Sequence, residues 1–230
     1  MTKLQEKLNF LLDKYDVSGT AELTSTQTAN INGTTVPVLS HRFERQFIEL
    51  KNIVLGGTLQ GVSVMRTARI VATGMDLYEQ LYRELDLCEY ILGRKIYTIM
   101  AMENGCCLNV IATAEGEVVC TIEISATLQP GETFKEKHEI ISQRGIACDV
   151  VVDAQLKQNS IYVFGAQNAQ YTDVDFELYG ISIAEIAVVR SAFALAKDGG
   201  IEKNLEADAH LQKLVALAKK SVVTGAKEVI

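Results

Sequence analysis

The residues best suited to binding chemistry are Glu79 and Arg83, which fall within one predicted helix. Glu79 and Arg83 are four residues apart, so their side chains share one face of a helix and can form an ion pair. Arg83 stays protonated near neutral pH, so it can hold an anion but cannot act as a general base. Two interpretations follow: a surface ion pair, which is the common outcome, or a binding site for an anion.

Other residue types that support catalysis or metal binding show no known spacing. The histidines His41, His138 and His210 form no H-E-x-x-H pattern and have no close carboxylate companion, so we expect ordinary surface or half-buried side chains. The five cysteines form no C-x-x-C pair, which predicts neither a zinc site nor a disulfide framework. No nucleophile signature of the G-x-S-x-G type is present. We therefore predict no catalytic residue and no metal site.

A group of acids in the second half of the sequence also lacks the spacing of a metal site. These acids follow no EF-hand pattern, and we expect them on solvated strand faces or turns. They are Asp149, Asp153, Asp173, Asp175 and Glu177.

Composition favours one folded protein that binds neither nucleic acid nor a membrane. The chain has 230 residues, of which 48% are hydrophobic and 22% are charged, as is typical of a globular protein with one core. The formal net charge of −7 and the absence of a Lys/Arg cluster argue against a nucleic-acid surface. No apolar run of about 18 residues and no signal peptide is present. We therefore expect a cytoplasmic protein with a single domain over residues 1–230, in which residues 1–40 form a helix and hairpin extension and residues 41–230 the main body.

The N-terminal extension is predicted to contain one helix and one hairpin. Thr2 and Gln5 have the spacing of a capping box, which predicts a helix over residues 3–15. The pair Asn32-Gly33 predicts a tight turn that joins two strands within residues 20–39.

The helix with the candidate site residues is predicted to follow a helix and a strand. Apolar spacing from Phe43 to Val54 predicts a helix, and Gly56 is expected to end it with a left-handed backbone conformation. A strand is expected over residues 62–71. Asp76 then caps the next helix, and Gly93 closes it.

After Gly93 the sequence predicts strands and then two helices. The first three strands are separated by short turns and should form a meander with one buried and one polar face. Ser182 and Glu185 predict a capped helix to about residue 197, and Asn204 is expected to cap a second helix to about residue 222, before a short terminal strand. The predicted strands cover residues 95–102, 106–114, 117–127, 138–143, 148–154, 160–164 and 175–179.

Several short motifs occur together in one order. They are "RF" at residues 42–43, "GGTLQG" at 56–61, Asp86 seven residues before Gly93, "ENG" at 103–105, "ISQRG" at 141–145 and "LEADAHLQKLVALAKKS" at 205–221. This order resembles the C-terminal domain of the glucose-fructose oxidoreductase, inositol dehydrogenase and MocA family over residues 38–230. The resemblance implies an α+β fold with a large, mostly antiparallel open sheet and helices packed on one face.

The resemblance also implies a substrate site and shows where this sequence departs from it. Family members carry a histidine that accepts the substrate's hydroxyl proton, and the matching helix positions here read Glu79, Leu81, Arg83 and Asp86, so only Asp86 is unchanged. Candidate substrate-binding residues by this resemblance are Arg42, Glu79, Arg83 and Asp86, and the resemblance implies a retained site for an anion or a sugar.

The resemblance further implies a cofactor that this sequence has no motif to bind. Family members bind NAD or NADP in a preceding Rossmann domain. No G-x-G-x-x-G turn is possible here because no two glycines stand two apart, and the family's Glu-Lys-Pro motif is absent. We expect no cofactor unless a separate Rossmann-domain subunit supplies NAD or NADP.

Three functional hypotheses remain open. The first is a non-catalytic, degenerate relative of the oxidoreductase C-terminal domain that acts as an oligomerisation or small-ligand-binding module, with a homodimer formed through the open sheet face. The second is the substrate-binding subunit of a split NAD(P)-dependent sugar or polyol dehydrogenase. The third is an unrelated α/β protein that binds a small polar ligand and resembles the family by accident.

Overall fold

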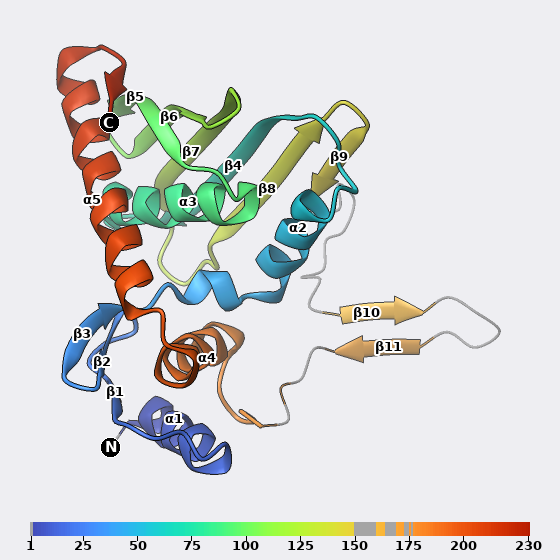
Figure 1. Ribbon diagram of the computed structural model, residues 1–230. Coiled ribbons are helices and arrows are strands. Elements are labelled where there is room, and N and C mark those ends of the chain that lie inside the picture. The colour runs from blue at the N-terminus through green and yellow to red at the C-terminus, as the bar shows by residue number, and fades with distance from the viewer. Residues whose placement is uncertain (1, 150–159, 164–168, 173–174, 176) are drawn as a thin grey trace. The chain divides into compact units, whose positions relative to one another are not determined.

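The computed structural model (Figure 1) describes residues 2–149, 160–163, 169–172, 175 and 177–230. Contacts divide the chain into two compact units, and each unit is built from two separate segments. The first unit comprises Met1–Phe43 and Val150–Gly200, and the second comprises Glu44–Asp149 and Ile201–Ile230. The predicted single domain over residues 1–230 stays a prediction.

The described part of the first unit combines helices with two small antiparallel sheets. One sheet has the order β1-β2-β3, and the other pairs β10 with β11. The helices are α1 (Lys3–Lys14), the 3-10 helix η1 (Ser40–Phe43) and α4 (Ile183–Asp198), and the strands are β1 (Ala21–Leu23), β2 (Thr28–Ile31), β3 (Thr34–Pro37), β10 (Ser160–Val163) and β11 (Ala169–Thr172).

Helix capping in this unit agrees with the sequence at α4 and in part at α1. The hydroxyl of Thr2 accepts a hydrogen bond from the backbone N–H of Gln5 at 3.3 Å, but the side chain of Gln5 bonds to Asn9, Ala21 and Leu23 and does not complete the predicted capping box. Ser182 and Glu185 form the complete reciprocal capping box at the start of α4. The helices α1 and α4 pack together, with the rings of Tyr15 and Phe193 5.4 Å apart. Both predicted helices are therefore confirmed.

Two strand predictions in this unit were wrong in detail. Residues 20–39 contain three strands rather than two, although Asn32 and Gly33 form the expected turn with positive φ angles of 51° and 84°. Residues 175 and 177–179 form a turn rather than a strand, because a carboxylate oxygen of Asp175 accepts the backbone N–H groups of Glu177 and Leu178. Most of the strand predicted over residues 148–154 lies outside the described residues.

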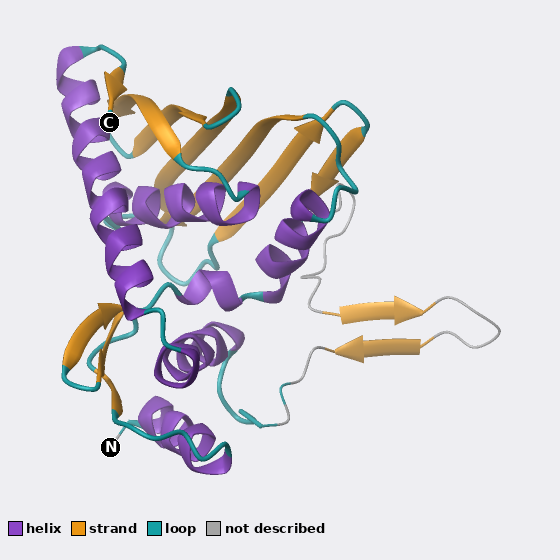
Figure 2. Ribbon diagram, in the orientation of Figure 1, coloured by secondary structure: helices purple, strands orange, loops and turns teal. Residues whose placement is uncertain are grey.

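The second unit is a seven-stranded mixed sheet with helices on one face (Figure 2). Its strand order is β12-β5-β6-β7-β4-β8-β9, and β4–β7 is its one parallel pair, so the sheet is mostly antiparallel as predicted. The predicted meander is confirmed as β5-β6-β7. The helices are α2 (Arg45–Leu55), α3 (Leu77–Leu92) and α5 (Ile201–Thr224), and the strands are β4 (Val62–Ala72), β5 (Ile96–Asn104), β6 (Cys107–Ala114), β7 (Val118–Leu128), β8 (Lys135–Ser142), β9 (Gly145–Cys148) and β12 (Glu228–Val229).

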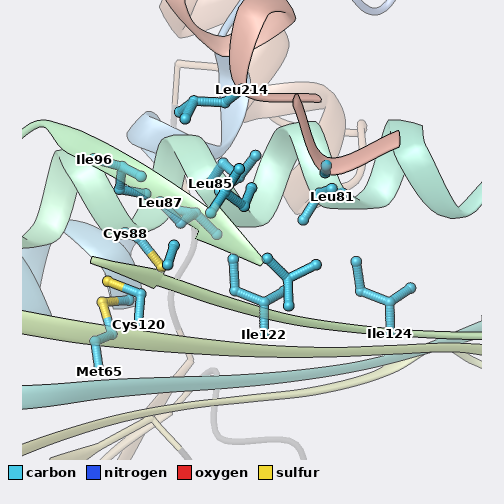
Figure 3. Close-up of a cluster of buried hydrophobic side chains, with 14 of the residues drawn as sticks. Met65, Leu81, Leu85, Leu87, Cys88, Ile96, Cys120, Ile122, Ile124 and Leu214 are labelled. Atoms are coloured by element: carbon cyan, nitrogen blue, oxygen red, sulfur yellow. The ribbon is translucent and has the colours of Figure 1, made fainter. Parts of the chain in front are cut away.

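The core of this unit lies between the sheet and α3. Residues of β7 alternate between buried and more exposed along the strand, because successive side chains of a strand point to opposite faces. Ile122 and Ile124 face Leu81 and Leu85 of α3 in this layer (Figure 3). All four are almost completely buried, and each such side chain contributes about 1.5–3 kcal/mol to folding.

Helix ends in the second unit show one confirmed and two incorrect predictions. Gly93 ends α3 with a left-handed φ of 63°, as predicted. Gly56 keeps a right-handed φ of −73°, and Gly57 provides the left-handed residue instead. Helix α5 begins at Ile201, so Asn204 lies inside the first turn rather than capping it.

None of the described helices combines the length and apolar composition needed to cross a membrane.

The face of the sheet opposite the helices carries exposed apolar side chains. On β5 and β6, the side chains of Met100, Met102 and Ile111 are 44%, 68% and 55% exposed. Met100 lies directly opposite Ile111 in the antiparallel register. This open face, defined by the outward residues of β5, β6, β7, β4 and β8, is therefore apolar at one end.

Candidate functional site

A cluster of charged side chains lies between α3 and the strands β4 and β8. The register places Thr67 opposite His138 and Arg69 opposite Glu136, and residues two apart on a strand share a face. Helix α3, which Asp76 caps through the N–H groups of Tyr78 and Glu79, brings Arg83 and Glu84 over this face. The start of α2 and Asp149, which follows β9, complete the cluster.

The centre of the cluster is His138, which lies between two carboxylates. Its Nδ1 is 2.5 Å from Asp149 Oδ2, and its Nε2 is 2.9 Å from Glu84 Oε2. Asp149 also accepts the backbone N–H of His138 at 2.7 Å. The ring of Phe47 on α2 packs edge-on against the imidazole, with centroids 4.7 Å apart. All three ionisable side chains are almost inaccessible to solvent.

Arg83 joins this histidine group to a second set of acids. Its Nη1 lies 2.7 Å from Glu84 Oε1 and 3.1 Å from Glu136 Oε2, and its Nη2 lies 3.5 Å from Glu44 Oε1. The guanidinium also lies over the ring of Phe47, 5.2 Å from its centroid. Arg83 is therefore held by three carboxylates and one aromatic ring.

Arg69 and Gln46 complete the hydrogen bonding around Glu136, and Gln80 holds Arg69 in place. Arg69 pairs with Glu136 and donates from Nε to Gln80 Oε1 at 2.8 Å. The amide of Gln46 donates to the other oxygen of Glu136 at 2.9 Å. Each oxygen of Glu136 therefore has a donor, which is the condition under which a buried carboxylate is tolerated.

Burial and the two carboxylates act in opposite directions on the pKa of His138. Burial lowers this pKa, but hydrogen bonds to Asp149 and Glu84 and their negative charges outweigh it and raise the pKa to about 9. For Glu84, burial raises the pKa, and the contacts with His138 and Arg83 lower it to about 2. At neutral pH the group is therefore an imidazolium between two carboxylates.

The pKa values of Glu44 and Arg83 are both raised, but for different reasons. Burial raises the pKa of Glu44 despite the nearby charge of Arg83. Burial lowers the pKa of Arg83, but the charges of Glu84, Glu136 and Glu44 raise it overall. Arg83 is therefore a permanent cation here, and neither it nor the protonated His138 can accept a proton near neutral pH.

The cluster also contains three atoms with the spacing of metal ligands. One atom each of Glu84, Glu136 and His138 lies within 4.8 Å of the others. The carboxylate oxygens and imidazole nitrogens of these residues already bond to Arg83, Arg69, Gln46, Asp149 or each other. A divalent cation would have to displace two guanidinium groups, so these residues fit a closed ion-pair network better than a metal site.

One polar atom beside the cluster lacks a partner. The hydroxyl of Thr67, opposite His138 on β4, is buried and makes no hydrogen bond within the described part of the chain. Such a group costs about 1–3 kcal/mol when left unsatisfied.

The four candidate site residues are placed in three different environments. Arg83 lies in the ion-pair network, Glu79 is exposed on the first turn of α3, and Asp86 is fully buried in the same helix. Arg42 lies in η1 of the first unit. Within the described residues, Arg83 forms ion pairs with Glu84, Glu136 and Glu44. The predicted surface ion pair between Glu79 and Arg83 is not formed in this part of the chain. Their role in substrate binding stays a prediction.

Sequence reasoning missed the centre of this cluster. His138 and His210 were expected to lack a carboxylate companion, but His210 pairs with Glu89 and His138 with two carboxylates. Asp149 was expected to be solvated, and its side chain is buried instead. Glu84 was not singled out. A usable signal was present in β8, where Glu136, His138 and Ile140 alternate with other residues and so share one face. Asp149 follows a different strand, and its approach depends on tertiary structure.

Comparison with known proteins identifies the class of fold to which this chain belongs. No protein-family model and no curated protein matches the sequence. Among solved structures, the chain is similar to a probable dehydrogenase from Thermotoga maritima, with 14% identity, a TM-score of 0.62, and 83% of this chain and 63% of that chain covered. The fold is therefore that of a dehydrogenase domain, as the sequence resemblance implied.

The similar structures include inositol dehydrogenases. The scyllo-inositol dehydrogenase from Lactobacillus casei, with bound NAD(H) and scyllo-inositol, is 13% identical with a TM-score of 0.58, and 83% of this chain and 63% of that chain are covered. The myo-inositol dehydrogenase from Corynebacterium glutamicum is 11% identical with a TM-score of 0.60, and 84% and 63% are covered. This chain spans less than two thirds of their length, which agrees with a match to their C-terminal domain.

Proposed function

We propose that this chain is a non-catalytic relative of the oxidoreductase C-terminal domain and that it functions as a homodimerisation module. The observation that supports its lack of catalysis is the state of Arg83. The sequence resemblance places Arg83 where related dehydrogenases have the proton-accepting histidine, and three carboxylates hold its guanidinium here. A cation so held is unsuited to take a proton from a substrate hydroxyl.

His138 is no substitute for the missing base. Its ring is fully buried, and both ring nitrogens face carboxylates. Its raised pKa keeps the ring protonated near neutral pH. A general base must be unprotonated and must reach the substrate, and His138 meets neither requirement in this arrangement.

The open face of the sheet supports the dimerisation role. Met100, Met102 and Ile111 form an exposed apolar area on β5 and β6, and such areas often mark association sites. The same face carries an ion-paired Arg66 and Glu139. A surface with apolar and both kinds of charged groups can pair with its own copy across a two-fold axis.

Placing a charge on this face is expected to separate the dimer. Ile111→Lys would bury a charge without a partner in the interface, so the dissociation constant should rise at least about tenfold. Sedimentation velocity over a range of micromolar concentrations measures this change. The matched control is Val223→Lys on α5, where the side chain is 86% exposed, and it should leave the dimer intact. A wild-type chain that stays monomeric throughout would contradict the proposal.

A second candidate is the substrate-binding subunit of a split NAD(P)-dependent sugar or polyol dehydrogenase. It is favoured by the similarity to a scyllo-inositol dehydrogenase solved with NAD(H) and scyllo-inositol. A separate Rossmann-domain subunit would then supply the cofactor, and Arg42, Glu79, Arg83 and Asp86 would be the candidate substrate contacts.

Thermal stability with and without ligands tests this second candidate. A polyol that binds only the folded chain, at a concentration 100 times its dissociation constant, adds about 2.7 kcal/mol to the free energy of unfolding. It therefore raises the melting temperature. Inositols, sugars and NADH are the probes. Glu79→Gln, at an exposed position, should remove a polyol shift but leave the ligand-free melting temperature unchanged. No shift with any of the probes would count against a ligand site in this chain.

A further inference from the structure

We propose that Asn104 is a site of spontaneous deamidation, and that Asn32, in the chain's other Asn-Gly pair, is protected by hydrogen bonds. In such a pair, the glycine nitrogen attacks Cγ of the asparagine, helped by the lack of a glycine side chain. A bond forms between the glycine nitrogen and Cγ, and the side-chain amide nitrogen leaves as ammonia. Water then opens the cyclic imide to give aspartate or isoaspartate. The reaction requires no cofactor and no oxidant.

Asn104 has both the exposure and the freedom that this reaction requires. It is the last residue of β5, its side chain is exposed, and its ladder partner Cys107 belongs to the final pair of the hairpin. Terminal pairs open at low free-energy cost. Within the described residues, no hydrogen bond holds its side-chain amide. A Cβ built on Gly105 or on Gly33 would meet nothing within 4 Å, so the two sites differ in their hydrogen bonds and not in the space beside the glycine.

Asn32 is also exposed, but both of its reacting groups are held. Its Oδ1 accepts the backbone N–H of Thr20 at 2.8 Å, which fixes the side-chain amide. The attacking group, the N–H of Gly33, donates to Oδ1 of Asn30 at 2.9 Å. The backbone N–H of Asn32 donates to Thr20 as well, at 2.8 Å. Cyclisation at Asn32 must break these bonds first, which slows it relative to Asn104.

The location of Asn104 gives the modification a consequence, which rests on the proposed dimerisation. Asn104 lies two residues after Met102, so both side chains belong to the open face of the sheet. Deamidation adds a negative charge at the end of this face. Two copies that meet through this face would each bring the added charge, which should weaken the dimer.

Peptide mass spectrometry of the aged, folded chain tests the proposal. In mildly alkaline buffer, Asn104 should convert several times faster than Asn32, whereas the two rates should become similar in urea, because both residues precede glycine. Asn30→Ala removes the acceptor of the Gly33 N–H and should speed conversion of Asn32 in the folded chain. Equal rates in the folded chain, or faster conversion at Asn32, would overturn the proposal.

A separate measurement tests the consequence for the dimer. Asn104→Asp carries the product's charge without the change in the backbone and should raise the dissociation constant, whereas Asn104→Gln should not. If Asn104 converts faster than Asn32 but Asn104→Asp leaves the dissociation constant unchanged, the modification site is supported and the proposed effect on the dimer is contradicted. A wild-type monomer removes the proposed function and leaves the comparison of the two rates intact.

Discussion

His138→Gln is expected to lower the free energy of unfolding by about 3–5 kcal/mol, the usual cost of removing one partner from a buried ion pair. The variant leaves Glu84 and Asp149 facing a neutral amide in a site that excludes water. For a chain of this size, such a loss lowers the melting temperature by roughly 10 °C. Urea denaturation followed by circular dichroism measures the change directly.

His210→Gln is the matched control for this substitution. His210 also pairs with a glutamate, with Nε2 2.6 Å from Glu89 Oε1. Its side chain is partly exposed, and Glu89 keeps Lys95 and the N–H of Ile96 as partners when the imidazole is lost. The cost should stay below about 1 kcal/mol. Equal losses in the two variants would show that the buried ion-pair network has no special importance for stability.

The second large effect is a loss of stability at alkaline pH. The pKa of His138 is raised from 6.5 to about 9 in the folded chain. A raised pKa means that the folded state binds the proton more tightly, so the stabilisation is complete below pH 6.5 and is lost as the pH rises through 9. The difference between these two pKa values corresponds to about 3 kcal/mol. Urea denaturation at a series of pH values between 6.5 and 10 tests this expectation.

Several charged groups surround the imidazole and determine this pH dependence. They are Glu84 and Arg83 on α3, Asp149 after β9, and Glu136 on β8. His138→Gln should remove most of the loss between pH 6.5 and 9. If that variant does not fold, the imidazole proton signals of the wild-type chain give the answer, because they should titrate near pH 9. Titration near 6.5 would contradict the ion-pair network.

The free energy of unfolding should also fall at acid pH, because Glu84 belongs to the same ion pair. The pKa of Glu84 is lowered to about 2 in the folded chain, so its contribution is present above 4.5 and is lost as the pH falls towards 2. The acid and alkaline effects report one shared interaction between Glu84 and His138. Their free energies therefore describe the same contact and do not add.

Local signals in the sequence predicted most of the individual elements. The caps at Asp76 and Ser182 and the left-handed Gly93 depend on neighbouring residues alone, and the structure confirms them. The meander followed from short turns between alternating strands. The turn at Asp175 was missed because its side chain competes with strand pairing for backbone N–H groups.

Long-range arrangement was the part that the sequence did not reveal. Strand β4 lies between β7 and β8, and its parallel pairing with β7 joins residues that are about 55 positions apart. The ion-pair network depends on that placement, because β4 supplies Arg69 and β8 supplies His138 and Glu136. Its acids lie on separate elements, so no spacing rule could group them. The fold class was predictable because the family resemblance already contained this arrangement.

Each compact unit is built from two stretches of chain, and this determines how the protein should respond to truncation and to proteolysis. Residues Leu211, Leu214 and Ala218 of α5 are buried in the same core as α3 and the sheet, although more than 50 residues of the other unit separate them from Asp149. A fragment that stops at residue 149 would expose the apolar surface that α5 covers. Proteolytic nicking between the two stretches should therefore leave both pieces associated, held by packing and not by the covalent chain.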